Sequence, residues 1–393
     1  MPTPRPVTAL LYVQHLLGIG HLVRAGALAR GLEVAGIRVV LVSGGMPVPV
    51  LDIGASISRF EQLPPVRVAD ETFKNLVDET GIPVDDAWKA RRRERLLSIF
   101  DHERPDIVLT ELYPFGRRKM RFEIEPLLER ARSLREQAGL PVIASSVRDI
   151  LVPPAKAERS EEIIERVRRY YDLVLTHGDG EVIPFERSFV RAGDIAGITR
   201  STGYVVGPVP ARQGPGAPGY QEVIVSAGGG AVSEDLLQAA IGARALCDLR
   251  ERIWRVLIGH NYSQAAFLAC RAAAPTGVLV ERARSDFTQL LANCALSISQ
   301  GGYNTVTEIL ATGARAVCLP FAGGRESEQT LRCRLLAERG LLQVVERDAL
   351  SAEQVALAVG RALESQPARG HVVDTDGAAR SAALLLEAVQ RQK

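Results

Sequence analysis

Short runs of apolar and β-branched residues alternate with longer amphipathic stretches in the first half of the chain. The short runs predict buried parallel strands, and the amphipathic stretches, with apolar positions three and four residues apart, predict the connecting helices. Strands are expected at Val7–Val13, Arg38–Ser43, Asp106–Glu111, Pro141–Ser146 and Asp172–His177, and helices at Val23–Val34, Phe122–Gln137 and Glu158–Tyr170. Residues 51–95 fit a helix, a lid or an insertion, and their structure stays open.

A proline- and glycine-rich segment, residues 207–219, follows a short strand expected at Tyr204–Val206. This segment lacks periodicity, which is typical of an exposed linker. A second alternating series follows it. The expected strands are Glu222–Ser226, Trp254–Ile258, Val278–Val280, Leu296–Ser299, Ala316–Leu319 and Leu342–Val345, and the expected helices are Ser233–Asp248, Ser263–Ala273, Phe287–Asn293, Asn304–Ala311, Glu328–Arg339, Ala352–Glu364 and Gly377–Gln390.

This pattern predicts an α/β protein with two Rossmann-like, doubly wound domains, residues 1–206 and 220–393, joined by the linker 207–219. A length of 393 residues suits two such cores. Ligands of doubly wound domains bind beyond the carboxyl ends of the strands. The residues that bind ligands are therefore expected in the loops that follow each strand.

Composition excludes several classes of function. The net charge of +2 gives no global field that would draw the chain onto nucleic acid. No apolar run approaches the roughly 20 residues of a membrane-spanning helix, and the first residues lack a secretory signal, so a cytoplasmic location is expected. The five cysteines lack Cys-x-x-Cys spacing, which disfavours structural zinc.

The first strand leads into a glycine-punctuated loop, residues 14–24, that contains Gly18, Gly20 and His21. A loop of this kind before a helix favours anion binding. The dinucleotide fingerprint G-x-G-x-x-G is incomplete because residue 23 is Val, so NAD binding is disfavoured. His21 is a candidate general base or hydrogen-bond donor to a substrate oxygen. The alternative is a helix-capping or buried structural histidine.

Two glycine-rich loops in the second half favour a nucleotide diphosphate. Gly228, Gly229 and Gly230 follow the strand 222–226, and Gly301-Gly302 follow the strand 296–299. Glycines let a backbone approach phosphate, and a helix N-terminus adds partial positive charge. Asn304 or Thr305 is expected to cap the next helix, and Glu308, one turn inside it, suits ribose hydroxyls.

These segments resemble glycosyltransferase family 28. The resemblance rests on residues 297–329, the loop 226–231 and Gly20-His21, and it is strong in the C-terminal domain and weak in the N-terminal domain beyond the first loop. It implies the GT-B architecture, in which two Rossmann-like domains face each other across a cleft. It also implies a nucleotide-sugar donor on the C-terminal side, an acceptor on the N-terminal side, and neither a metal nor a cofactor.

The resemblance assigns roles residue by residue. Gly229 and Gly230 and the segment 301–305 would hold the diphosphate, and Phe287 would lie near the nucleobase. Glu308 would bind ribose, and Glu328 with Gln329 would hold sugar hydroxyls. The donor-side set is Gly228, Gly229, Gly230, Arg284, Phe287, Gln300, Gly301, Gly302, Asn304, Thr305, Glu308, Glu328 and Gln329. Two departures leave the donor sugar open: the first loop reads Gly-Ile-Gly-His instead of Gly-Gly-His, and Glu328 replaces a polar amide.

Three residues compete for the role of catalytic base: His21, Glu111 and Asp149, each near the carboxyl end of a predicted strand. Arg284 is a candidate for a bidentate diphosphate contact, or else a surface residue. The basic, aromatic segment 112–121 suits an anionic acceptor, peripheral contact with a membrane surface, or a solvated charge run.

The sequence therefore predicts a metal-independent glycosyltransferase that moves a hexose-type sugar from a nucleotide sugar, expected to be a UDP-sugar, to an acceptor hydroxyl. The acceptor is a small molecule, a glycan or a lipid-linked molecule, and the oligomeric state is open. Two alternatives remain: a nucleotide-sugar hydrolase or epimerase on the same fold, and a non-catalytic nucleotide-sugar-binding protein.

Overall fold

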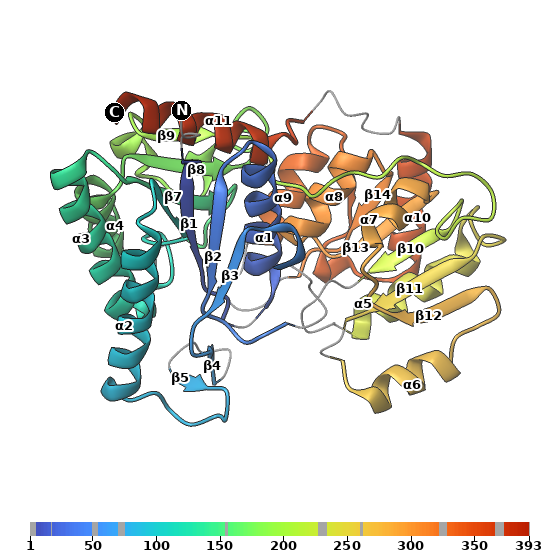
Figure 1. Cartoon of the computed structure of the whole chain (residues 1–393). Coiled ribbons are helices and arrows are strands. Elements are labelled where there is room, and N and C mark those ends of the chain that lie inside the picture. Colours follow the sequence, from blue (N-terminus) through green and yellow to red (C-terminus); the bar gives the residue numbers. More distant parts are fainter. Residues whose placement is uncertain are drawn as a thin grey trace. The chain divides into compact units, whose positions relative to one another are not determined.

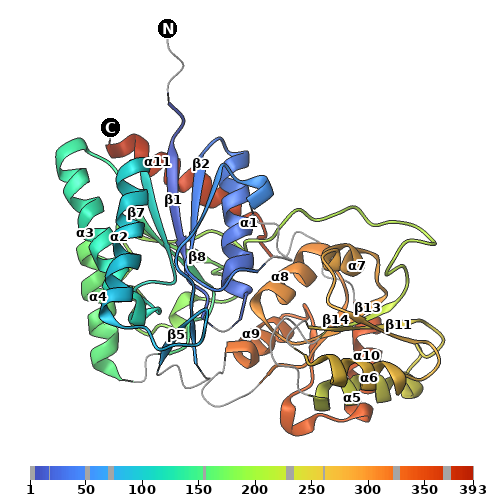
Figure 2. The same cartoon turned by 60° about the horizontal axis from the view of Figure 1, so that its bottom comes forward.

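The computed structural model describes residues 5–16, 18–48, 54–69, 75–153, 156–226, 234–259, 262–321, 328–365 and 373–392. The chain forms two α/β units (Figures 1 and 2). The first unit comprises residues 1–205 together with 376–393, and the second comprises residues 206–375.

The first unit is built on a parallel sheet of seven strands in the order β3-β2-β1-β6-β7-β8-β9. The strands are β1 (Thr8–Val13), β2 (Arg38–Ser43), β3 (Arg59–Gln62), β6 (Ile107–Glu111), β7 (Val142–Arg148), β8 (Leu173–His177) and β9 (Thr199–Ser201). Every residue of β1 and β6 is buried, because helices cover both faces of the sheet. The five strands predicted in this half are therefore confirmed, and β3 and β9 add one strand at each edge.

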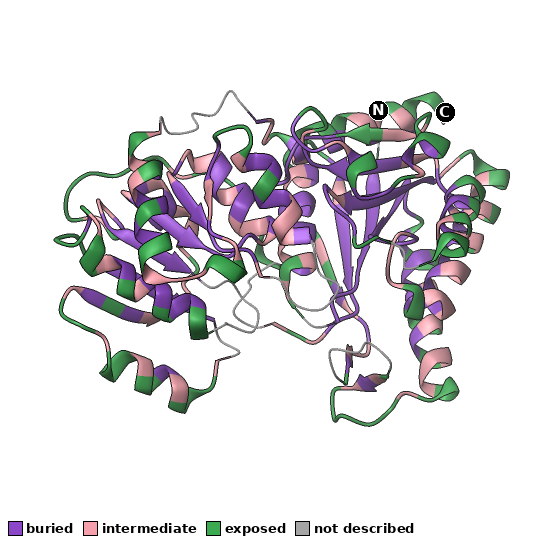
Figure 3. Cartoon of the chain, turned by 180° about the vertical axis from the view of Figure 1, so that it is seen from behind, coloured by how far each residue is buried: buried purple, intermediate pink, exposed green. Residues whose placement is uncertain are grey.

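Helices of the first unit form a layer on each face of the sheet. They are α1 (Gly20–Val34), α2 (Asp86–Glu103), α3 (Arg121–Ala138), α4 (Ala157–Tyr170) and α11 (Gly377–Gln392). Residues Ala9, Leu11 and Val13 of β1 pack with α1 and α11, whereas Leu10 and Tyr12 pack with α2 and α3. This alternation places successive side chains of one strand in two separate cores. Figure 3 shows the buried strands and the exposed outer faces of the helices.

The predicted C-terminal domain boundary is wrong, because α11 belongs to the first unit. Its residues Ala382, Leu385 and Val389 share a core with α1 and β1. The two helices approach closely at Gly31, where an added Cβ would overlap the side chain of Ala378. A helical period predicts that residues 377–390 form a helix, but it carries no information about which sheet the helix covers.

The segment 51–95, which the sequence left open, holds several short elements and the start of α2. Besides β3, the described part contains an antiparallel pair, β4 (Val66–Val68) and β5 (Leu76–Asp78). Helix α2 starts after Asp85, whose side chain caps it by accepting the N–H of Trp88 at 2.7 Å.

The second unit is built on a parallel sheet of six strands in the order β12-β11-β10-β13-β14-β15. The strands are β10 (Val223–Ser226), β11 (Trp254–Ile258), β12 (Val278–Arg282), β13 (Leu296–Ser299), β14 (Ala316–Cys318) and β15 (Gln343–Val344). The helices are α5 (Glu234–Ala243), α6 (Gln264–Ala272), α7 (Phe287–Asn293), α8 (Tyr303–Thr312), α9 (Glu328–Ala337) and α10 (Ala352–Glu364). The predicted alternation of strands and helices is confirmed here.

Two details around the linker differ from the sequence-based prediction. Residues 204–206 form no strand, and Val205 makes only an isolated bridge with Asp376. The linker 207–219 is largely exposed, but it is hydrogen-bonded to Asn293, the last residue of α7. The Asn293 side chain accepts the N–H of Gln213 at 2.8 Å and donates to the carbonyl of Pro218 at 2.8 Å.

Candidate functional site

In the first unit, His21 and Glu111 form one hydrogen-bonded pair. Helix α1 begins at Gly20, so His21 lies in the first helical turn and not in the preceding loop as predicted. Glu111 is the last residue of β6, which is the neighbour of β1 in the sheet. The His21 Nδ1 atom lies 2.7 Å from a Glu111 carboxylate oxygen. The strand order therefore brings together two residues that the sequence analysis treated as competitors.

The charge state of this pair follows from its surroundings. Burial raises the pKa of Glu111, but the electrostatic interactions with His21 and with the Arg24 guanidinium, together with the hydrogen bond from His21, outweigh burial and hold this pKa at about 2. Burial, and next the positive charge of Arg117, lower the pKa of His21 to about 3 against the opposing effect of Glu111. At neutral pH, Glu111 is therefore ionised and His21 is neutral.

The tautomer of His21 follows from that charge state. An ionised carboxylate only accepts hydrogen bonds, so the Nδ1 atom of His21 carries the proton and donates it to Glu111. The Nε2 atom then holds a lone pair and can accept a proton. The side chain keeps 19% of its surface exposed. Such an arrangement suits a general base that is oriented by a buried carboxylate.

Asp149 occupies a different environment. It follows β7, is 2% exposed, and accepts the N–H of Ile150 at 2.8 Å. This carboxylate oxygen is thus engaged by the backbone of the loop that follows β7. The geometry therefore favours His21 over Asp149 as the base, and Asp149 remains a prediction from the sequence.

Two arginines of this site were not predicted from the sequence. Arg24 lies one turn after His21 on α1, is 3% exposed and forms an ion pair with Glu111. Arg117 follows β6 within the basic segment 112–121 and lowers the pKa of His21. The spacing of His21 and Arg24, three residues apart on one helix, is a sequence signal for a shared partner.

On the donor side, the N-terminus of α8 carries no side-chain cap. The capping residue is Gly302, so the prediction that Asn304 or Thr305 caps this helix is wrong. The first intrahelical bond runs from the N–H of Val306 to the carbonyl of Gly302 at 3.0 Å. A helix N-terminus without a capping oxygen, directly after a buried strand, is suited to an anion.

The two glycines of this turn have different surroundings. An added Cβ at Gly301 would overlap the Sγ atom of Cys333, whereas an added Cβ at Gly302 would meet nothing within 4 Å. Gly301 is therefore required by packing within the second unit. Gly302 faces open space, so a ligand can approach the protein backbone there without a steric clash.

Glu308 is one turn inside α8 and is half-buried. Its carboxylate accepts the hydroxyl of Thr288, on α7, at 2.9 Å. Burial raises the pKa of Glu308 to about 7, and the Thr288 bond lowers it only partly. Phe287, the first residue of α7, is also half-buried. The structure thus brings the first turn of α7 into contact with Glu308 of α8, and a nucleobase and ribose site at this place stays a prediction.

Three further donor-side residues have partners within the chain. The Glu328 carboxylate pairs with the buried Arg332 at 2.6 Å, and the Gln329 side-chain oxygen accepts the N–H of Phe321 at 3.0 Å. Arg284 binds Asp286 through two bonds of 2.8 and 2.7 Å. Sugar or phosphate contacts by these side chains therefore stay predictions, and for Arg284 such a contact would compete with a bidentate ion pair.

Gln300 lies at the end of β13 and is buried, and its N–H donates to the carbonyl of Ser226 at 3.2 Å. The glycines Gly228, Gly229 and Gly230 lie outside the described residues. In the described part of the chain, no group of three or more His, Cys, Asp or Glu side chains is placed to hold a metal ion. None of the helices described is both long enough and apolar enough to cross a bilayer.

Comparison with known proteins shows what the second unit resembles. Residues 223–376 match the model of the glycosyltransferase family 28 C-terminal domain. The UDP-N-acetylglucosamine–N-acetylmuramyl-(pentapeptide) pyrophosphoryl-undecaprenol N-acetylglucosamine transferase of Albidiferax ferrireducens is 32% identical over 131 residues, 31% of this chain and 34% of that protein. The transferase of the same name from Aromatoleum aromaticum is 28% identical over 204 residues, 51% of this chain and 54% of that protein. The chain thus spans about a third to a half of these relatives.

Solved structures resemble the whole chain. A glycosyltransferase of kitacinnamycin has a TM-score of 0.59 with 16% identity, covering 99% of this chain and 96% of that one. The MurG protein of Acinetobacter baumannii has a TM-score of 0.56 with 14% identity, covering 97% and 99%. The glycosyltransferase VinC, solved with dTDP, has a TM-score of 0.60 with 13% identity, covering 98% and 100%. At these identities the likeness shows the fold, and it is the GT-B fold that the sequence predicts. The comparisons therefore show a likeness to the C-terminal domain of glycosyltransferase family 28 at residues 223–376, within a chain that has the GT-B fold.

Proposed function

We propose that this protein is a glycosyltransferase that moves a sugar from a nucleotide-sugar donor, a UDP-sugar, to a hydroxyl of an acceptor molecule. The donor binds the second unit at the start of α7 and α8, and the acceptor binds the first unit near His21. The observation that carries the proposal is the His21–Glu111 pair, in a chain that also carries a family 28 donor domain. A nucleotide-binding protein without catalytic activity has no need of a neutral histidine oriented by a buried carboxylate.

On the donor side, the diphosphate lies at the N-terminus of α8 and the ribose hydroxyls donate to Glu308. Backbone amides and the helix dipole stabilise the leaving diphosphate, so the reaction needs no metal ion. Gly302 supports this placement because nothing fills the space beside it. Glu308 supports it because its carboxylate, once ionised, can accept hydrogen bonds from two ribose hydroxyls.

On the acceptor side, His21 accepts the proton of the attacking hydroxyl. The acceptor oxygen forms a bond to the anomeric carbon of the sugar, the bond from that carbon to the diphosphate oxygen breaks, and the nucleoside diphosphate leaves. The proton moves to the Nε2 atom of His21, and Glu111 stabilises the resulting imidazolium. This step requires the acceptor site of the first unit to meet the donor sugar of the second unit, which is part of the proposal.

Uridine is proposed as the base because the sequence relatives that share the donor domain are named for a UDP-sugar donor. The fold neighbours include a protein solved with dTDP, so the nucleobase is a point to test directly. The donor sugar stays open, because Glu328, at the position expected to hold its hydroxyls, is paired with Arg332.

A thermal-shift screen tests the proposed function. The protein is heated in EDTA with UDP-N-acetylglucosamine, UDP-glucose, GDP-mannose or dTDP-glucose, because a ligand that binds the native state raises its apparent stability. We expect a UDP-sugar to raise the melting temperature more than the GDP and dTDP sugars. Stabilisation that requires magnesium or manganese would contradict the metal-independent donor site, and no stabilisation by any nucleotide sugar would contradict the proposed function.

A further inference from the structure

A pocket of about 200 Å³ opens at the carboxyl ends of β6 and β7, next to the loop that follows Glu111. Its walls come from the segment 113–118, from Val152 and Pro153 after β7, and from α4. The apolar part of the lining includes Phe115, Val152 and Ile163. Doubly wound domains bind ligands at this edge of the sheet, so the position suits a substrate.

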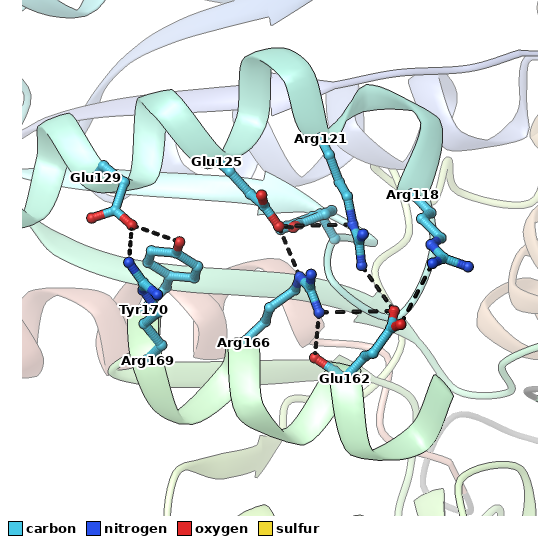
Figure 4. Close-up of polar contacts among 9 residues, drawn as sticks. Arg118, Arg121, Glu125, Glu129, Glu162, Arg166, Arg169 and Tyr170 are labelled. Atoms are coloured by element: carbon cyan, nitrogen blue, oxygen red, sulfur yellow. Dashed lines mark hydrogen bonds and ion pairs between the residues drawn. The ribbon is translucent and has the colours of Figure 1, made fainter. Parts of the chain in front are cut away.

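Three of the five arginines that line this pocket form ion pairs in a network that joins α3 and the turn before it to α4 (Figure 4). Arg121 and Arg118 bind Glu162 at 2.9 and 3.5 Å, and Arg166 binds Glu125 at 2.8 Å. The hydroxyl of Tyr113 also donates to Glu125, at 2.6 Å. This network ties the walls of the pocket together, and it engages Glu162, the one carboxylate among the described lining residues.

Arg117 also lines the pocket. Its Nε and one of its terminal nitrogens are buried, and within the described part of the chain they make no hydrogen bond. Burying guanidinium donors without an acceptor is costly, and such groups in proteins are normally paired. A partly exposed arginine at a pocket wall, with two donors that lack an acceptor, is therefore a ready partner for an anion from outside the protein.

The backbone places Arg117 at this position in a specific way. Arg117 has a left-handed backbone conformation, with φ of 58°, and so does Leu112, with φ of 66°. A turn bond of 2.9 Å runs from the N–H of Gly116 to the carbonyl of Leu112, and a Cβ at Gly116 would lie 2.7 Å from the Leu112 side chain. Strained conformations of this kind persist where the surrounding structure requires them, and they cluster at ligand sites.

We propose that this pocket is the acceptor subsite and that it takes a small acceptor carrying a carboxylate or phosphate group on an apolar scaffold, with the anionic group bound by Arg117. The inference rests on the proposed function, because it names the substrate class of the same transferase. The apolar lining holds the scaffold, and the guanidinium fork binds the two oxygens of the anion. Arg117 also influences the charge of His21, which ties the pocket to the proposed base.

The test uses three matched probes: 2-naphthoate, 2-naphthyl phosphate and the neutral 2-naphthamide. Their affinities are measured by calorimetry on the full-length wild type, on Arg117→Gln and on a control, Arg130→Gln. Arg130 is an exposed arginine of α3 that pairs with Asp101 outside the pocket. We expect at least one anionic probe to bind the wild type and the control at least tenfold more tightly than naphthamide. Arg117→Gln should lose this preference.

Equal affinity of the three probes for the wild type, or an unchanged preference in Arg117→Gln, would overturn the proposal. Binding to anionic phosphatidylglycerol vesicles without binding to the probes would also overturn it, in favour of membrane contact. If Arg117→Gln does not fold, the ring signal of His21 in the wild type gives an independent readout by NMR. An anion on Arg117 should raise the pKa of His21, because it neutralises a positive charge that lowers this pKa; an unchanged pKa under saturating probe would contradict the site.

The proposal and the proposed function fail in different ways. The probes report on the first unit, whereas the donor screen reports on the second. Loss of donor binding with intact, Arg117-dependent probe binding would contradict the transferase and leave an anion site. Donor binding without probe discrimination would leave the transferase and contradict the charged acceptor.

Discussion

The location of single protons determines what the residues of this site can do. Glu111 is ionised and holds the Nδ1 proton of His21, so the opposite nitrogen of the ring is the basic one. Glu308 has the reverse character, since burial raises its pKa to about 7. Glu111 thus stays charged because Arg24 and His21 contact it. Glu308 is half-protonated near neutral pH because its side-chain partner within the described part of the chain is the neutral hydroxyl of Thr288.

Donor binding should depend on pH through Glu308. Ribose hydroxyls donate to the ionised carboxylate, so binding favours the deprotonated form. Affinity for a UDP-sugar should therefore be full above about pH 8 and should weaken by up to tenfold per pH unit as the pH falls below about 7. The diphosphate of a UDP-sugar does not titrate in this range. Calorimetric titrations between pH 6 and pH 8.5 measure this effect.

A pair of variants isolates the contribution of this carboxylate. Glu308→Gln should bind the donor more weakly by about 1–3 kcal/mol at pH 8 and show a flat pH profile. Glu338→Gln, which changes an exposed residue of the same unit, should keep the wild-type profile. A slope retained in Glu308→Gln would assign the titration to another group and would remove Glu308 from the ribose site.

At the scale of elements, the turn between β13 and α8 combines a packing requirement with an open face. Gly301 is confined by Cys333, whereas Gly302 is not confined. The sequence predicts the turn from Gly301-Gly302, but it does not show which glycine is needed for folding and which for a ligand. This distinction depends on α9, which brings Cys333 to the turn from more than 30 residues away.

Gly301→Ala should destabilise the folded protein by about 1–3 kcal/mol, the usual cost of overpacking a buried site. Gly302→Ala should leave the free energy of unfolding nearly unchanged and weaken donor binding. Denaturant unfolding and donor titration of both variants measure the two effects. Replacing Cys333 by Ala in the Gly301→Ala background should recover part of the stability, because it removes the Sγ atom that the new Cβ would overlap; no recovery would refute the assigned contact.

Elements were predictable where the pattern of residues is local. The buried strands β1, β6, β10 and β13 are short runs rich in apolar residues, and the helices between strands show a helical period, so the succession of strands and helices along the chain was predictable. The start of α1 and the cap of α8 were not predictable in the same way. Helix α1 begins directly after Ile19, which has no capping side chain, so no capping residue marks its start and His21 falls inside it. Helix α8 follows the capping residue Gly302, where the sequence predicts a cap at Asn304 or Thr305.

At the scale of the whole chain, the C-terminal helix returns to the first unit. This return was invisible in the sequence because amphipathic helices that cover either sheet have the same period. The same limit applies to the site: His21 and Glu111 are 90 residues apart, and only the order of β1 and β6 in the sheet makes them neighbours. The motifs and the loops that carry them were predictable, but the side-chain contacts that depend on the order of strands in the sheet were not.

Leu385→Ala should destabilise the first unit specifically. Leu385 is fully buried against α1, and removing such a side chain costs about 2–5 kcal/mol. Hydrogen exchange measured by mass spectrometry should accelerate in peptides from β1, β2 and α1 and should stay unchanged in β10 and β13. The matched control is Leu357→Ala, whose side chain on α10 is 56% exposed. Faster exchange confined to the second unit would contradict the placement of α11.

The transferase account needs both units in one reaction, with His21 acting on the acceptor and the donor held elsewhere. The most direct test is the rate of UDP release from saturating UDP-N-acetylglucosamine, with a cellular metabolite extract as the source of acceptor, for the wild type and His21→Ala. Donor affinity should agree within about threefold between the two proteins, and UDP release should fall by roughly a hundredfold or more in the variant. Equal rates of UDP release by the two folded proteins, or no release by the wild type, would contradict the account.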